Sequence, residues 1–96
     1  MSLKIIFKDK KTQARIGSLK TKRGIVETPF FMPVATKTSV KHISSHDLEE
    51  MNCKAIISNT FILHLRPGEK LIKQLGGIGK FMSWKGINVT DSGGFQ

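Results

Sequence analysis

Three short apolar segments, each followed directly by polar residues, constrain the fold of this chain more than any other feature. They cover residues 30–34, 53–58 and 87–90, and two segments with helical features separate them. Strands and helices that alternate with short connections predict parallel strands joined by right-handed crossovers. We therefore expect an α/β fold over residues 29–96, in which the polar residues after all three strands meet at one edge of the sheet.

The two helices between these strands have recognisable starts and ends. The first is expected to begin at Ser44 or Ser45, because acidic residues in its first turns suit the helix dipole, and to end at Asn52. Pro67 fits the first position of the second helix, and a glycine pair marks its end. Residues 78–86 are then expected to form a loop that its apolar side chains anchor.

Residues 1–28 have a different pattern, in which short β-prone runs are separated by polar turns at residues 8–13 and 22–24. Strands of this length with such turns predict a small antiparallel sheet. The pattern changes at Pro29. The sequence therefore predicts two parts, an antiparallel sheet over residues 1–28 and an α/β segment over residues 29–96.

The polar residues after the third strand form the richest candidate site, the run Asp-Ser-Gly-Gly-Phe-Gln at residues 91–96. The carboxylate of Asp91 can accept two hydrogen bonds from a planar donor edge, and glycines allow a ligand to approach the backbone closely. Phe95 offers a flat face for stacking, and Asn59 follows the second strand as Asp91 follows the third. These features suit a pocket for a flat, nitrogen-rich ring. The same run is also ordinary turn chemistry, with Asp91 as an Asx-turn former.

The charge balance of the chain favours an anionic partner. Sixteen Lys and Arg residues against seven Asp and Glu residues give a net charge of +9. This charge predicts nucleic acid as the first class of partner and an acidic membrane surface as the second, unless the lysines only form a solvated surface. The three histidines lack the spacing of a metal site, so we expect no metal or cofactor in this chain.

The location of the protein is constrained by its apolar runs and its cysteine content. No apolar run reaches the roughly 18 residues of a membrane span, so no membrane association through a span is expected. Cys53 is the single cysteine and cannot form an internal disulfide. We therefore expect a cytoplasmic protein, because a reducing compartment is the default for such a chain.

Four long stretches of the chain resemble the tRNA-guanine transglycosylases, the queuine tRNA-ribosyltransferase family. They cover residues 15–41, 59–69, 75–86 and 89–96, and end with the motif VTDSGGFQ. The resemblance extends over essentially the whole chain and corresponds to the N-terminal part of the family, with the pieces LRPG and KFMSW closer to the bacterial enzymes. It implies a (β/α)₈ TIM barrel, of which this chain holds the first three strands, preceded by a small antiparallel sheet.

The resemblance also implies a reaction and a set of site residues. Members exchange a genetically encoded guanine in tRNA for a 7-deazaguanine, queuine or its precursor, by double displacement. Asp91 matches the aspartate that binds the base and acts as general acid and base, and Phe95 matches the aromatic residue that stacks on the base. The other matched positions are Ser92, Gly94 and Gln96 in the base pocket, Asn59 beside the catalytic carboxylates and Val34 near the ribose.

Two departures from the family pattern accompany this resemblance. Phe61 and Ile62 stand where the family has Tyr and His, and the nucleophilic aspartate and the zinc site of the family lie beyond Gln96. We therefore expect the 96-residue chain alone to be inactive and to need a C-terminal polypeptide that completes the barrel, or another copy of itself. Zinc is expected in that C-terminal part. The alternative functions are a small basic RNA-binding module and an inactive gene fragment.

Overall fold

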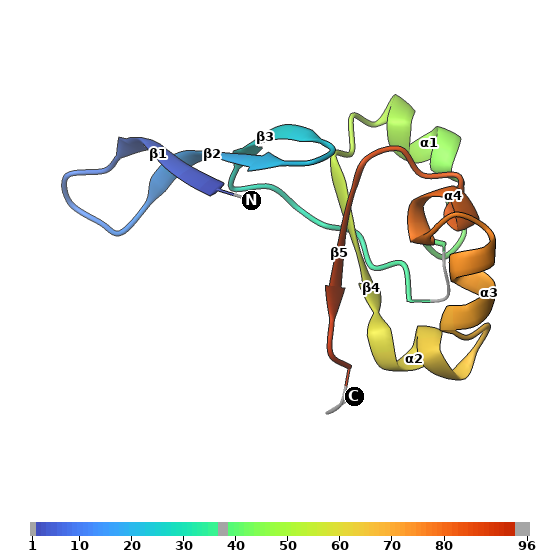
Figure 1. The fold of residues 1–96 in the computed structure, drawn as a ribbon. Helices are drawn as coiled ribbons and strands as arrows, with labels where there is room; N and C mark the ends of the chain where they lie inside the picture. Colours follow the sequence, from blue (N-terminus) through green and yellow to red (C-terminus); the bar gives the residue numbers. More distant parts are fainter. Residues whose placement is uncertain (1, 37–38, 94–96) are drawn as a thin grey trace. The chain divides into compact units, whose positions relative to one another are not determined.

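A computed structural model of the chain describes residues 2–36 and 39–93 (Figure 1). The chain divides into two compact units, which we call unit 1, Met1–Phe31, and unit 2, Met32–Gln96. The division lies three residues after Thr28, the last residue before the change of pattern in the sequence. Within the described residues no helix is long and apolar enough to cross a membrane.

Unit 1 contains an antiparallel sheet of three strands in the order β1-β2-β3, as the sequence predicted. The strands are β1, Ser2–Lys8, β2, Arg15–Thr21, and β3, Gly24–Thr28. The first turn is closed by the carboxylate of Asp9, which accepts hydrogen bonds from the backbone and the hydroxyl of Thr12. These bonds lower the pKa of Asp9, so the carboxylate that closes the turn is charged at neutral pH.

Unit 2 is a layer of short helices packed on a parallel pair of strands, so the chain has a mixed α/β fold. Strands β4, Ala55–Asn59, and β5, Ile87–Asp91, pair in parallel and in register from Ala55 opposite Ile87 to Asn59 opposite Asp91. Figure 1 shows the helices together on one side of these two strands. The helices are α1, Ser45–Glu50, α2, Thr60–Leu65, α3, Glu69–Gln74, and α4, Ile78–Met82.

The strand expected over residues 30–34 is not formed, which corrects the prediction of three parallel strands. A single parallel bridge joins Val34 to Ile57, with hydrogen bonds from Ala35 N to Ile57 O (2.7 Å) and from Ile57 N to Pro33 O (3.0 Å). Proline has no backbone N–H, so the prolines at positions 29 and 33 each remove a donor that a longer ladder would need. The segment keeps the expected parallel direction beside β4.

The prediction of a single helix that starts at Pro67 is wrong, because two helices lie between β4 and the glycine pair. The side chain of Asn59 accepts a hydrogen bond from Ile62 N (2.8 Å), which caps α2 at the end of β4. Arg66 is extended, as is usual before a proline, and this ends α2. The second helix, α3, then starts at Glu69 rather than at Pro67.

The glycine pair ends α3 as expected, but the loop predicted over residues 78–86 contains a further helix. Gly76 has φ +91°, and Gly77 N donates to Ile72 O (2.9 Å), a Schellman arrangement in which glycine is preferred. The carbonyl of Gly77 then accepts from Phe81 N (3.0 Å) and begins α4. A five-residue helix that contains a glycine has little intrinsic propensity, so its packing rather than its sequence stabilises it.

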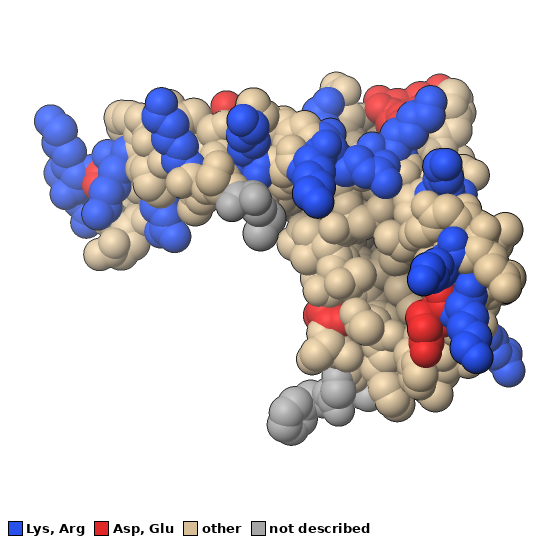
Figure 2. Space-filling model, in the orientation of Figure 1, with Lys and Arg blue, Asp and Glu red and all other residues tan. Residues whose placement is uncertain are grey.

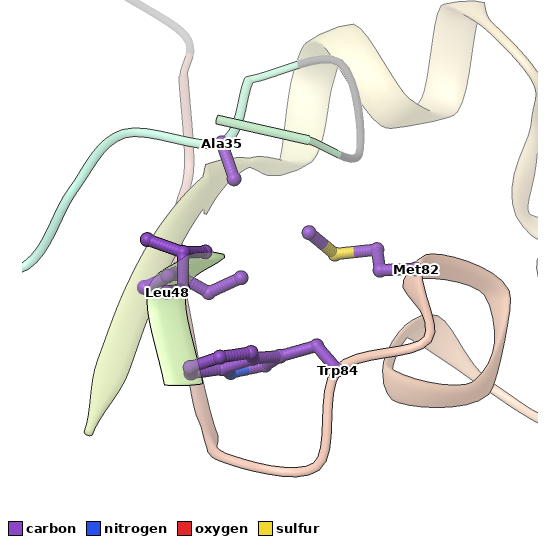
Figure 3. Packing of buried hydrophobic residues seen from close by; sticks show 5 residues of the cluster. Ala35, Leu48, Met82 and Trp84 are labelled. Carbon is purple, nitrogen blue, oxygen red and sulfur yellow. The ribbon is translucent and has the colours of Figure 1, made fainter. Parts of the chain in front are cut away.

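The core of unit 2 lies between the helices and β4. Ala35, Leu48, Ile56, Met82 and Trp84 form one buried cluster, and Figure 3 shows their side chains directed toward a common centre. Trp84 also donates its indole N–H to Ile87 O (3.2 Å), which joins the segment after α4 to the start of β5. The expected anchoring of residues 78–86 by apolar side chains is therefore confirmed.

Helix α1 begins with a capping box that makes a testable contribution to stability. Ser44 Oγ accepts from Asp47 N (3.1 Å), and the Asp47 carboxylate accepts from Ser44 N (3.0 Å). We expect Ser44→Ala to lower the free energy of unfolding by about 1 kcal/mol at neutral pH. Ser44→Asp keeps an acceptor at the cap and should lose much less. Equilibrium denaturation with urea measures the difference.

The contribution of the same capping box to stability depends on pH, and the pKa of Asp47 gives the direction of this dependence. The Ser44 backbone N–H, followed by the Ser44 hydroxyl, lowers the pKa of Asp47 below its ordinary value of 3.8. A carboxyl group whose pKa is lowered by folding stabilises the folded chain above its unfolded pKa and loses this effect as pH falls through the folded pKa. The stability difference between wild type and Asp47→Ala, which removes the carboxylate, should therefore shrink below about pH 3.8. A constant difference down to strong acid would contradict the assignment.

Candidate active site

The parallel register of unit 2 brings three of the candidate residues to one face of the sheet. Asn59 and Asp91 are opposite each other as the last residues of β4 and β5, and Ile57 is opposite Val89. Val34 pairs with Ile57 along the edge of β4 that faces away from β5. Because alternate residues of a strand share a face, Val34, Asn59 and Asp91 lie on the same side of the sheet, toward the carboxyl ends of its strands.

This shared face is the one opposite to the helices. Ile56, the neighbour of Ile57 in β4, belongs to the helix-side core, so Ile57 and Asn59 are on the other side. The face is apolar below the candidate residues, because Ala55 and Ile87 are both buried there. A carboxylate and an amide therefore stand at the rim of an apolar surface, an arrangement typical of ligand sites in parallel sheets.

Asn59 has a structural role that sequence analysis did not identify. Its side chain is 4% exposed, and its Oδ1 accepts the Ile62 N–H that begins α2. The backbone of Gly93 lies against the same amide group. Asn59 therefore holds the end of β4, the start of α2 and the chain after β5 in one arrangement, which positions the segment that follows Asp91.

Gly93 gives a direct test of this arrangement. It has φ +68°, and a Cβ atom at this position would overlap the side-chain amide of Asn59. We expect Gly93→Ala to displace Asn59, weaken the cap of α2 and destabilise unit 2 by about 2 kcal/mol or more. Gly24→Ala is the control, because Gly24 also has positive φ but a Cβ atom there meets nothing within 4 Å. Urea denaturation compares them, and equal losses would contradict the contact.

The remaining candidate residues follow Asp91 along the chain. Asp91 is partly buried, Ser92 is exposed and Gly93 is buried. Gly94, Phe95 and Gln96 lie outside the described residues. The structure therefore brings together Val34, Asn59 and Asp91.

Asp91 differs from the other acidic residues by its place in the fold. Asp9 and Glu27 belong to unit 1, and the other carboxylates of unit 2 lie on or beside helices: Asp47, Glu49, Glu50 and Glu69. Among the residues that the structure describes, no group of three His, Cys, Asp or Glu side chains could hold a metal ion. The chemistry that the described part of this face can supply is therefore that of one carboxylate beside an amide, which binds donors and moves protons.

Two cavities of unit 2 were not foreseen from the sequence. One, of about 560 Å³, lies among α2, α3, α4 and β5, where His64 Nδ1 is 2.7 Å from Glu69 Oε2. A backbone hydrogen bond makes the largest contribution to lowering the pKa of the Glu69 carboxyl group, and the contact with His64 lowers this pKa further. The other, of about 530 Å³, is lined by Val34, Thr36, Ser39 and Lys41. It adjoins the candidate face through Val34, and its described polar side chains all come from residues 36–41, a polar loop that matched no known site motif by itself.

Comparison with known proteins assigns the family. The sequence model of the family described as "Queuine tRNA-ribosyltransferase" matches residues 9–96. The queuine tRNA-ribosyltransferase of Thermoanaerobacter pseudethanolicus is 50% identical over 93 residues, which are 97% of this chain and 25% of the relative. A putative queuine tRNA-ribosyltransferase of Archaeoglobus fulgidus is 49% identical over 96 residues, which are 100% of this chain and 24% of the relative.

A third relative agrees with these two in identity and extent. The queuine tRNA-ribosyltransferase of Caldanaerobacter subterraneus subsp. tengcongensis is 50% identical over 92 residues, covering 96% of this chain and 24% of the relative. This chain therefore spans about a quarter of the length of the curated relatives it matches. Because the family match includes both parallel strands and the whole candidate face, the chain belongs to the queuine tRNA-ribosyltransferase family.

Proposed function

We propose that this chain forms the base-binding part of an enzyme that exchanges guanine in tRNA for a 7-deazaguanine, queuine or its precursor. The observation that carries the proposal is the register of β4 and β5, which sets Asn59 beside Asp91 at the carboxyl ends of the strands. In parallel α/β sheets and barrels this end is where ligands bind. The names of the relatives indicate tRNA as the macromolecular substrate.

Asp91 is the residue that recognises the base in this proposal. Guanine presents adjacent N–H donors on one edge, and a carboxylate that accepts both makes strong charge-assisted hydrogen bonds. The same carboxylate can then hold or release a proton as guanine leaves and the new base enters. The neighbouring positions complete the pocket, with Phe95 stacking on the base, Ser92, Gly94 and Gln96 around it, and Val34 near the ribose.

The target nucleotide has to leave its base stack before Asp91 can reach it. Unit 1 carries eight Lys and Arg residues and two acidic residues, a net charge of +6, and Figure 2 shows these basic side chains spread along it. Such a surface attracts the phosphate backbone without regard to sequence. Unit 1 therefore contributes to tRNA affinity, whereas unit 2 provides base recognition.

Double displacement needs a nucleophile in addition to Asp91. One carboxylate cannot attack the ribose while it binds the base and exchanges a proton with it. None of the other six acidic residues lies at the end of a parallel strand. The two parallel strands and the Val34 bridge fit the beginning of a (β/α)₈ barrel. We propose that the remaining three quarters of the family length complete the barrel and supply the nucleophile and the zinc ligands.

A chimeric enzyme tests this function. Residues 1–96 replace the matching quarter of the T. pseudethanolicus relative, and incorporation of labelled guanine into tRNA is measured. We expect exchange by the chimera and none by residues 1–96 alone. Addition of the downstream part of the relative as a separate polypeptide should restore exchange. A chimera that unfolds cooperatively and binds tRNA but exchanges no base would refute the proposal and favour an RNA-binding module.

A further inference from the structure

The cavity of about 560 Å³ among α2, α3, α4 and β5 is an apolar groove bordered by charged side chains, and we call it the outer groove. Its apolar lining is formed by Leu63, Ile72 and Ile78, and the exposed side chains of Glu69 and Lys73 line it as well. Leu63 is buried, whereas Ile72 and Ile78 are only half-buried. An apolar surface that a folded unit leaves open in this way marks a contact with another segment or partner.

The helix layer of unit 2 ends before it covers β5. Ser58 and Thr90 are opposite each other in the pairing of β4 with β5, and both are on the face that holds Ile56 and the helices. Ser58 is 1% exposed, but Thr90 is exposed and lines the outer groove. The outer groove is therefore the part of this face that the helices leave open beside β5.

The order of the parallel segments predicts what covers the outer groove. Val34 pairs along one edge of β4 and β5 along the other edge, so the sheet grows in one direction along the chain. Within the described residues β5 pairs with β4 alone, so the next parallel strand of a barrel would add at the other edge of β5. A right-handed connection to that strand runs over the same face as the helices that connect β4 to β5. This path crosses the outer groove.

A second copy of this chain fits the outer groove poorly. Copies related by a two-fold axis through the groove bring the same surface of each chain together, so that one hollow faces another. Filling the groove with a different surface of the copy gives a head-to-tail contact, which leads to rings or open chains. The segment that directly follows β5 in the same chain needs no such symmetry, and its covalent connection gives it a high effective concentration at the groove.

We propose that the outer groove binds the segment that connects β5 to the next strand in the complete family length, which we call the connecting segment. The proposal rests on the proposed function only in requiring that the barrel is completed. This chain has about a quarter of the length of its relatives, and the connecting segment belongs to the remainder. Its side toward the groove is apolar and covers Ile72, and its polar side chains lie toward Glu69 and Lys73. Because Gly76 and Gly77 line the groove without side chains, the backbone of the connecting segment can approach them closely.

The chimeric enzyme provides the test, with Ile72 replaced by the photoreactive residue p-benzoylphenylalanine. As matched control the same residue replaces Leu71, which neighbours Ile72 on α3, is 40% exposed and is not among the lining residues of the groove. After irradiation, mass spectrometry of the peptides identifies what has been attached. We expect position 72 to attach to the connecting segment of the same molecule, and position 71 to give little of this product. Attachment of position 72 to a second molecule, or to no part of the connecting segment, would overturn the proposal.

Ile72→Glu measures the same contact through stability. In residues 1–96 alone the half-buried position leaves the new carboxylate a route to water, whereas the connecting segment would bury it in the chimera. We therefore expect Ile72→Glu to lower the urea midpoint of the chimera at least about twice as far as that of residues 1–96. Leu71→Glu should lower both midpoints equally.

Equal shifts in the two proteins for Ile72→Glu would contradict the contact. If Ile72→Glu prevents residues 1–96 from folding, Ile72→Ala gives the same comparison, because its lost apolar contacts are more numerous where the groove is filled. Equal shifts for Ile72→Ala would then overturn the proposal.

The design separates this proposal from the proposed function. Attachment of position 72 to the connecting segment in a chimera that exchanges no base would leave the groove contact standing and remove the enzyme assignment. Normal exchange that depends on Asp91, without that attachment, would remove only the groove contact.

Discussion

Asp91→Asn in the chimeric enzyme is expected to lower the rate of base exchange by about a thousandfold. The amide has nearly the shape of the carboxylate, but it carries no charge and cannot take or return a proton at pH 7. General acid–base groups contribute 10²–10⁴-fold, and loss of a charge-assisted pair of hydrogen bonds to the base adds to this effect. The measurement is incorporation of labelled guanine into tRNA under saturating substrate.

Glu49→Gln is the matched control for this variant. It makes the same change of carboxylate to amide in unit 2, but on the exposed surface of α1. Its exchange rate should remain within about twofold of wild type, and its stability should change by about 0.5 kcal/mol or less, as is usual for a surface substitution. Exchange by Asp91→Asn at a rate close to wild type would show that another group recognises the base.

Trp84→Ala is expected to destabilise unit 2 by about 3–5 kcal/mol, the largest effect of any single side chain on its stability. The indole is 2% exposed, packs in the cluster that contains Leu48 and Ile56, and donates to Ile87 O. Its ring also lies so close to the Gly86 backbone that a Cβ atom there would overlap it. Removal of the ring leaves a cavity and removes the indole hydrogen bond to the carbonyl of Ile87 at the start of β5.

Two further variants separate the contributions of Trp84. Trp84→Phe keeps much of the apolar volume but loses the hydrogen bond to Ile87 O, so its loss should be about half that of Trp84→Ala. Leu65→Ala removes a large side chain that is 63% exposed and should change stability by at most about 1 kcal/mol. Urea denaturation followed by circular dichroism compares all three. A Trp84→Ala loss as small as that of Leu65→Ala would contradict the assigned core.

The Asp91 and Trp84 variants are connected through β5. Trp84 holds Ile87 at the start of this strand, and Asp91 is its last residue. Parallel pairing with β4 then sets Asp91 opposite Asn59, whose amide fixes both α2 and the backbone of Gly93. The core on the helix side and the candidate site on the other side of the sheet therefore depend on the same two strands, so core variants should also lower base affinity.

Features that depend on a few adjacent residues could be predicted from the sequence by itself. The antiparallel sheet of unit 1 follows from short β-prone runs and polar turns, and the ends of α1 and α3 follow from Ser44, Asn52 and the glycine pair. These are local effects of capping groups and of residues that tolerate positive φ. The four matched stretches also predicted the family, because long motifs in a fixed order carry much more information than composition.

Tertiary structure alone decided the features that depend on distant partners. Residues 30–34 had the composition of a buried strand, but Pro29 and Pro33 limit the pairing to the bridge at Val34. Helix α4 has weak intrinsic propensity and forms because Met82 and Trp84 are buried by segments far away in sequence. Short apolar runs do not specify their own conformation, so packing decides between strand, helix and loop.

The candidate site shows the same division. The sequence by itself identified Asp91 and Asn59 as polar residues at strand ends, because a change from apolar to polar residues is a local pattern. Their mutual register and the cap that Asn59 forms on α2 were decided only by the folded chain. Register is a property of two strands and their common packing, and a shift of one residue would move Asp91 to the opposite face of the sheet.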